Sequence, residues 1–131
     1  MVYKELEDAK EVFHAKCRHC YTCIKSCQVE DPKPVEAALN IIFDKPANVD
    51  SLWRCVNCHT CSYACPENLD PRSLVYLARR RFPPPPRLQV FINNILSVGA
   101  VMELNPEIEE IREACGAIKL KPAKDVVEAL R

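Results

Sequence analysis

Eight of the nine cysteines in this 131-residue chain fall into two short runs with identical spacing. The first run is Cys17, Cys20, Cys23 and Cys27, and the second is Cys55, Cys58, Cys61 and Cys65. Every member of the second run follows its counterpart by 38 residues, which indicates an internal repeat. Thiolates are soft metal ligands, and cysteines clustered in a reducing compartment serve metal or redox chemistry more often than disulfides. The repeat therefore predicts two related metal sites.

The spacing within each run, C-x2-C-x2-C-x3-C, is typical of 4Fe-4S ligation. The four irons of such a cluster each need one thiolate, and three closely spaced cysteines can wrap one face of the cluster. The fourth cysteine points away, and in two-cluster ferredoxins it ligates the other cluster. We therefore predict two 4Fe-4S clusters with crossed ligand sets: Cys17, Cys20, Cys23 and Cys65 for cluster 1, and Cys55, Cys58, Cys61 and Cys27 for cluster 2. Loss of either set is expected to damage both sites.

Two other uses of the cysteines are weaker interpretations. Zinc prefers two separated C-x2-C pairs around one tetrahedral ion, which would leave the third cysteine of each run over. A disulfide framework would strand at least one thiol, because the total is odd. Pro66 follows the second run as in bacterial ferredoxins, whereas Gln28 follows the first and changes the turn after Cys27. His19 and His59 lie between ligands and are interpreted as solvated loop residues.

The segments around the cysteine runs carry apolar residues at helical spacing. One stripe precedes the first run, and one follows each run after an Asp-Pro pair, Asp31-Pro32 or Asp70-Pro71. The stripes are Val2, Leu6, Ala9 and Phe13, then Val35, Ala38, Leu39 and Ile42, then Leu74, Leu77, Ala78 and Phe82. No segment alternates as a strand would. We predict an all-α fold in which a cluster loop and a helix form a duplicated unit.

Four consecutive prolines, Pro83 to Pro86, favour an extended spacer because they cannot continue a helix. We predict a two-cluster core over 1–82, a spacer over 83–86, and C-terminal helices over 87–131 that pack on the core or on a partner subunit. These helices carry Leu88, Phe91, Ile92 and Ile95, then Asn105, Pro106, Ile108 and Ile111, then Ala123, Val126, Val127 and Leu130. Cys115 shares a face with Ile108 and Ile111, before Gly116 ends that helix, and we expect its thiol to be buried.

Composition and charge exclude several other classes. Lys plus Arg equals Asp plus Glu, at 18 each, so no basic surface predicts binding of nucleic acid. Gly99 and Gly116 are too few and too far apart for a nucleotide-binding loop. The charged N-terminal segment is unlike a signal peptide, and the longest uncharged stretch, 88–102, is shorter than the roughly 20 residues that cross a bilayer. We expect a cytoplasmic protein with no transmembrane segment.

The chain resembles the small iron-sulfur subunit of heterodisulfide reductase in its runs CRHCYTCIKSC and CVNCHTCSYACP, in the lead-in Leu52-Trp53-Arg54, and in the later segment EIREACG. The resemblance implies an alpha-helical ferredoxin with two 4Fe-4S clusters that works as an electron-transfer subunit. It also implies two partners, a flavin-containing subunit and a catalytic subunit with CCG domains that reduces a disulfide. The chain itself carries no nucleophile with its base, so we expect it to be non-catalytic.

Basic residues near the runs are expected to stabilise the more negative reduced clusters. They are Arg18, Lys25, Arg54 and Arg72. The run from Arg79 to Arg81 is interpreted as positive charge that complements a helix end. Two other functions remain open: a free-standing soluble dicluster carrier that shuttles between enzymes, and a zinc-organised adaptor with no redox role.

Overall fold

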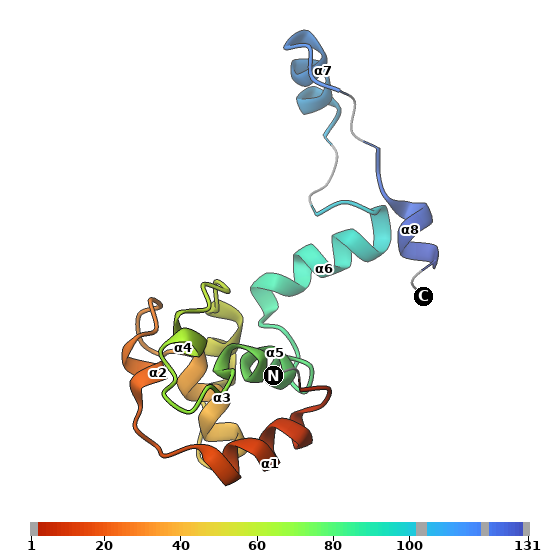
Figure 1. Ribbon diagram of the computed structural model, residues 1–131. Helices are drawn as coiled ribbons and strands as arrows, with labels where there is room; N and C mark the ends of the chain where they lie inside the picture. Colours follow the sequence, from red (N-terminus) through yellow and green to blue (C-terminus); the bar gives the residue numbers. More distant parts are fainter. Residues whose placement is uncertain (1–2, 102–104, 119–120, 130–131) are drawn as a thin grey trace. The chain divides into compact units, whose positions relative to one another are not determined.

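The computed structural model describes residues 3–101, 105–118 and 121–129, and the regular elements in these ranges are all helices. This confirms the all-α fold class. The contacts divide the chain into two compact units, Met1–Pro84 and Pro85–Arg131. The division falls inside the proline run, whose last member, Pro86, is already the first residue of a helix (Figure 1).

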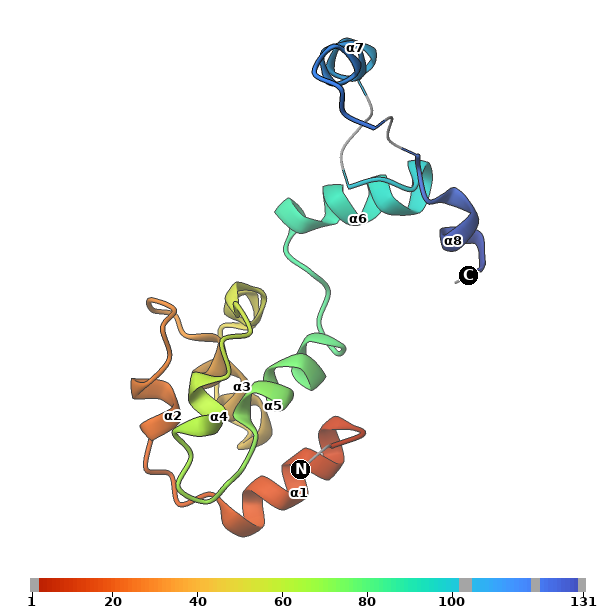
Figure 2. The same ribbon diagram turned by 45° about the horizontal axis from the view of Figure 1, so that its top comes forward.

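The first unit contains five α-helices and one 3-10 helix. In chain order these are α1 (Leu6–Lys16), α2 (Thr22–Lys25), α3 (Pro34–Ile42), the 3-10 helix η1 (Val49–Arg54), α4 (Thr60–Tyr63) and α5 (Pro71–Arg79). Helix α3 packs against α5 and η1, and α1 packs against α5. The short helices α2 and α4 contact each other, so the two cysteine runs lie side by side (Figure 2).

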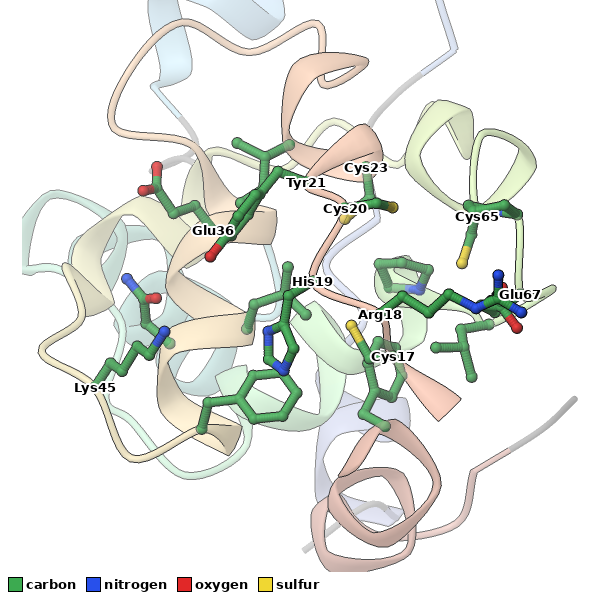
Figure 3. A pocket seen from close by; sticks show the side chains of 18 residues that line it. Cys17, Arg18, His19, Cys20, Tyr21, Cys23, Glu36, Lys45, Cys65 and Glu67 are labelled. Atoms are coloured by element: carbon green, nitrogen blue, oxygen red, sulfur yellow. Dashed lines mark ion pairs between the residues drawn. The ribbon is translucent and has the colours of Figure 1, made fainter. Parts of the chain in front are cut away.

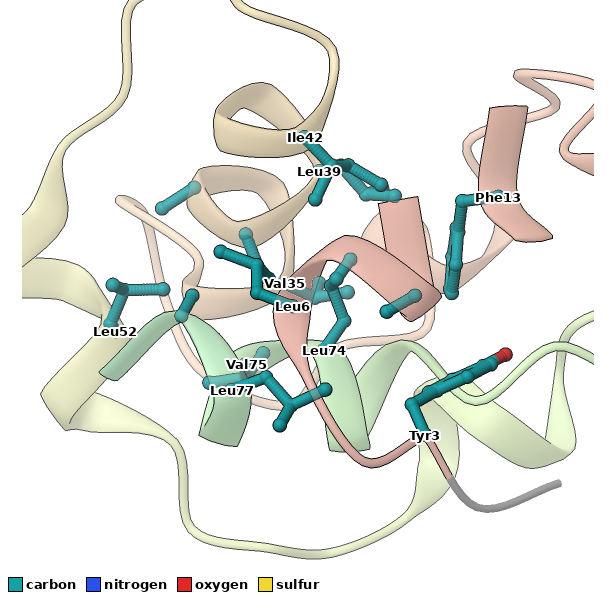
Figure 4. Close-up of a cluster of buried hydrophobic side chains, with 14 of the residues drawn as sticks. Tyr3, Leu6, Phe13, Val35, Leu39, Ile42, Leu52, Leu74, Val75 and Leu77 are labelled. Atoms are coloured by element: carbon teal, nitrogen blue, oxygen red, sulfur yellow. The ribbon is translucent and has the colours of Figure 1, made fainter. Parts of the chain in front are cut away.

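The core of the first unit is built from the predicted apolar stripes. All four members of the α3 stripe are buried, and so are Leu74, Leu77 and Ala78 of α5. Leu6, Ala9 and Phe13 of α1 join them, whereas Val2 lies outside the described residues. Figure 4 shows these side chains meeting between α1, α3 and α5. Burial of this apolar surface is the main driving force for the fold, and it provides a scaffold for the cysteine loops.

The two repeated helices begin at prolines, but not at equivalent ones. Helix α5 begins at Pro71, where the Asp70 side chain accepts a hydrogen bond from the Ser73 N–H. Helix α3 begins at Pro34 rather than at Pro32. The residue before a proline is driven out of helical conformation, and Lys33 is accordingly extended, with φ −81° and ψ 134°. The helix therefore starts after the second proline of the first copy.

The second unit contains α6 (Pro86–Val98), α7 (Pro106–Ala114) and α8 (Lys124–Ala129), as the apolar spacing predicts. Leu130, the last member of the predicted stripes, lies outside the described residues. Helix α6 ends at Gly99, which has φ 72°, and its carbonyl accepts a hydrogen bond from Ala123 N at 2.9 Å. A Cβ on Gly99 would lie 2.6 Å from the backbone nitrogen of Lys124, so the contact between α6 and α8 requires glycine here.

The prediction that Cys115 is buried is wrong. Helix α7 is capped by Asn105 and followed by Gly116 as expected, but Cys115 is exposed at its C-terminal end. Ile108 and Ile111, on the same face, are 49% and 64% exposed. The face is apolar in sequence, but no other element of the described chain covers it. Within the described residues, no helix is long and apolar enough to span a membrane.

Candidate metal centre

The two cysteine loops have the same backbone conformation. Left-handed residues occur at His19 and Tyr21 in the first loop, and at Asn57 and His59 in the second, again 38 positions apart. A four-residue helix follows directly in each loop, α2 after Tyr21 and α4 after His59. Non-glycine residues rarely adopt positive φ, so two matched pairs show that the repeat extends from sequence to local structure.

The first loop and the end of the second form one pocket. Its lining includes the cysteines Cys17, Cys20, Cys23 and Cys65, and its volume is about 340 Å³. Figure 3 shows the four sulfur atoms around a common space, with Cys65 reaching in from the second run. The structure therefore brings together the four cysteines predicted to hold the first cluster, and the cavity is far larger than a single ion.

The other four cysteines line a second pocket. They are Cys27, Cys55, Cys58 and Cys61, and the free volume between them is about 20 Å³. The same four were predicted to hold the second cluster. Their four thiols provide a suitable donor set, but the space between them is much narrower than in the first pocket. Across the described part of the chain, no three His, Cys, Asp or Glu side chains converge as the ligands of one metal ion do.

Each pocket has one exposed thiol with an enhanced tendency to ionise. The Thr22 hydroxyl donates a hydrogen bond to Cys20 Sγ at 3.3 Å, and the Thr60 hydroxyl donates one to Cys58 Sγ at 3.4 Å. These bonds lower the pKa of the Cys20 and Cys58 thiols, because they stabilise the thiolate. The repeated threonine therefore favours the form of cysteine that binds metal.

Each pocket also has an inner thiol with the opposite tendency. Burial raises the pKa of Cys23 to about 12, with neighbouring cysteines adding to the effect. Burial likewise raises the pKa of Cys61 to about 11. These two thiols hold their protons at neutral pH in the metal-free state, so metal binding must release them.

The second loop is anchored by Asp70. Its carboxylate accepts hydrogen bonds from the Ser62 and Ser73 hydroxyls and lies 3.4 Å from Arg72, while its backbone N–H donates to the Tyr3 hydroxyl at 3.3 Å. Burial raises the pKa of Asp70, but the hydrogen bonds from Ser62 and Ser73 outweigh it, and the net effect lowers the pKa. Asp70 thus joins α4, which carries Cys61, to the start of α5.

Two basic side chains contact the backbone of the second pocket's cysteines. Lys33 Nζ donates to the carbonyls of Ile24, at 3.0 Å, and Cys27, at 3.4 Å. Arg79 Nε donates to the Leu52 carbonyl at 2.8 Å, and Arg79 Nη2 donates to the Cys55 carbonyl at 3.1 Å.

The Arg79 guanidinium also lies over two aromatic rings, 5.3 Å from the centroid of Trp53 and 4.9 Å from that of Tyr76. The sequence analysis missed Lys33 and interpreted Arg79 only as helix-end charge. The spacing of Tyr76 and Arg79 on one helix face is a signal that could have suggested the stacking.

The four basic residues singled out in the sequence differ in position. Arg72 lines the second pocket, and Arg18 lines the first but pairs with Glu67 at 2.8 Å. Arg54 donates to the carbonyls of Asp31 and Pro32, and Lys25 is exposed at the end of α2.

The two loop histidines are exposed, as predicted. The His19 ring lies 4.4 Å from that of Phe43, and the His59 ring lies 6.5 Å from that of Tyr63.

Comparison with known families supports the nature of the site. Residues 16–69, which include all eight clustered cysteines, match the model of the 4Fe-4S dicluster domain. No curated protein matches the chain. The paired thiol pockets and this match identify an iron-sulfur protein of ferredoxin-like type. Such a protein carries electrons on 4Fe-4S centres, with cysteine thiolates as the protein ligands.

Proposed function

We propose that this chain is the electron-transfer subunit of a heterodisulfide reductase-like complex in the cytoplasm. It would relay electrons between a flavin-containing subunit and a catalytic CCG-domain subunit that reduces a disulfide. The proposal assigns one 4Fe-4S cluster to Cys17, Cys20, Cys23 and Cys65, and a second to Cys27, Cys55, Cys58 and Cys61. The observation that carries it is the crossed grouping of the cysteines in two adjacent pockets.

In this function the chain holds, spaces and insulates the redox groups. Each bound 4Fe-4S cluster supplies a one-electron couple while its thiolate ligands remain in place. The left-handed loop residues direct successive cysteines toward a common space, and the contact between α2 and α4 keeps the two pockets adjacent. The Thr22 and Thr60 hydroxyls and the nearby basic groups stabilise negative charge on the sulfurs.

The second unit supports a role as a subunit. It lies outside the matched segment, and it contributes no cysteine to either pocket. Its helices expose large apolar side chains, namely Val90, Phe91, Ile95, Ile108 and Ile111. Exposed apolar helix faces of this kind are typical of surfaces that bind another protein.

The test is anaerobic purification of the native assembly, followed by analysis of iron, acid-labile sulfide and accompanying chains. The proposal expects about 8 irons per chain, the content of two 4Fe-4S clusters, and fixed amounts of a flavoprotein and a CCG-domain protein. A loaded chain that purifies alone supports the free-standing carrier instead. A colourless chain that contains zinc and lacks sulfide supports the adaptor.

A matched pair of variants tests the role of the second unit in assembly. Phe91→Asp places a charge on an exposed apolar position of α6, and Asn93→Asp places the same charge on a polar position of that helix. We expect Phe91→Asp to lose the accompanying subunits and keep its iron, whereas Asn93→Asp keeps both. Equal retention of the partners by the two variants would contradict docking through α6.

A further inference from the structure

The two pockets differ in the electric charge around them. Four charged side chains line the first pocket: Arg18, Lys45, Glu36 and Glu67. Their charges balance. Arg18, the one nearest to the cysteines in sequence, is 77% exposed and pairs with Glu67 at 2.8 Å. An exposed and paired cation is strongly screened, so it contributes little field at the sulfurs.

The second pocket is surrounded by positive charge. Lys33 and Arg79, both only partly exposed, donate hydrogen bonds to the carbonyls of Cys27 and Cys55. Both of these cysteines line the second pocket. Arg72 lines it too, although Asp70 offsets its charge at 3.4 Å. Among the described residues, no lysine or arginine makes a comparable bond to the carbonyl of a cysteine in the first pocket.

Solvent exposure does not offset this difference. Each pocket combines one exposed thiol, Cys20 or Cys58, with three that are partly or fully buried. Both exposed thiols accept the same threonine hydrogen bond. Water access and hydrogen bonding to sulfur are therefore similar at the two sites, and the cations form the main difference.

From this asymmetry we infer that the site of Cys27, Cys55, Cys58 and Cys61 has the higher reduction potential of the two, because Lys33 and Arg79 stabilise its reduced state. The inference rests on the proposed function, since it requires a cluster at each site. An added electron makes a site more negative, and a partly buried cation close to its ligands lowers the energy of that state. An electron delivered to the chain then resides mainly at the second site. Its transfer oxidises the first site and reduces the second by one electron each, so no further reactant is required.

The experiment is a redox titration of the anaerobically purified protein, followed by electron paramagnetic resonance. Two variants remove the cations while keeping a hydrogen-bond donor, Arg79→Gln and Lys33→Gln. Two matched variants keep the charge, Arg79→Lys and Lys33→Arg. Arg18→Gln removes the exposed, paired cation of the first pocket. Iron and acid-labile sulfide are measured on every variant.

The inference expects two midpoint potentials in the parent protein. Arg79→Gln and Lys33→Gln should each shift the higher potential to a more negative value and leave the lower one nearly unchanged. The charge-conserving variants should restore the higher potential, and Arg18→Gln should shift neither.

A shift of the lower potential by the two glutamine variants would overturn the inference, and so would fully loaded variants with unchanged potentials. Because Arg79 also packs on aromatic rings, Lys33→Gln decides the question if Arg79→Gln loses its iron. A parent protein with iron for only one cluster, or none, would instead refute the proposed two-cluster function.

Discussion

The two cysteine loops are nearly identical in backbone and different in their supports. Both place left-handed residues before a four-residue helix and direct a threonine hydroxyl at the second cysteine of the run. In the first loop, the Ser26 hydroxyl donates to carbonyls of its own loop, those of Thr22 and Cys23. In the second, the Ser62 hydroxyl donates to Asp70, outside the loop. The repeat thus conserves the ligand geometry, while the surrounding residues make the two sites unequal.

Replacement of the fourth cysteine in each run gives the largest expected effect. Cys27→Ala should remove the cluster of the second site and Cys65→Ala that of the first, because each of these thiols lies in the pocket of the opposite run. Iron should fall from about 8 to about 4 per chain in each variant. Iron analysis and spin quantitation provide the measurement.

The identity of the remaining site is read with a second substitution. In the Cys27→Ala background, Thr22→Val should shift the remaining potential and Thr60→Val should not, and the reverse should hold with Cys65→Ala. If each variant instead loses the site of its own run, the ligands are not crossed.

Removal of the Asp70 carboxylate gives an intermediate effect, confined to the second loop. Asp70→Ala should lower the free energy of unfolding by about 1–3 kcal/mol, because it removes a helix cap and leaves two hydroxyls without their acceptor. Ser26→Ala, in the first loop, should cost less than about 1 kcal/mol. Urea unfolding of the iron-free protein provides the measurement.

The effect of Asp70→Ala depends on pH in a defined direction. The pKa of Asp70 is lowered in the folded state, so its stabilising contribution is complete above the unfolded pKa of about 3.9. It is lost as the pH falls through the lower, folded pKa. The difference between parent and variant should therefore be constant from about pH 7 to pH 5 and shrink below about pH 4. A difference that grows in acid would contradict this role.

The threonine hydroxyls give the smallest expected effect. A hydrogen bond to a cluster sulfur stabilises the reduced state, and a typical bond of about 1 kcal/mol corresponds to roughly 40 mV for one electron. Thr22→Val should make the potential of the first site more negative by about that amount, and Thr60→Val that of the second. Thr22→Ser and Thr60→Ser, which keep the hydroxyl, should restore the parent values. Equal shifts at both sites from one variant would show that the threonines act indirectly.

The features predicted from the sequence are those that depend on local spacing. The duplicated runs, the helices after them and the buried stripes follow from residues within a few turns of one another. Asn105 and Gly116 bound α7 as their capping preferences require.

The missed features depend on contacts between distant parts of the chain. Arg79 reaches the Cys55 carbonyl across 24 residues, and the Tyr3 hydroxyl reaches Asp70 across 67. No local pattern encodes such contacts, because they depend on how α5 packs on η1 and how the N-terminal segment lies against the second loop. Cys115 was misjudged for a related reason. An apolar helix face is buried only where another element covers it.

The exchange of Cys27 and Cys65 between the pockets has a consequence for the origin of the chain. One half of the repeat, alone, offers three sulfurs to one centre and a single sulfur to another. A shorter precursor with one copy could have completed its centres only by pairing with a twin, each lending the other a thiol. Fusion of the twins into one polypeptide would have preserved that mutual loan and freed each half to acquire its own neighbours.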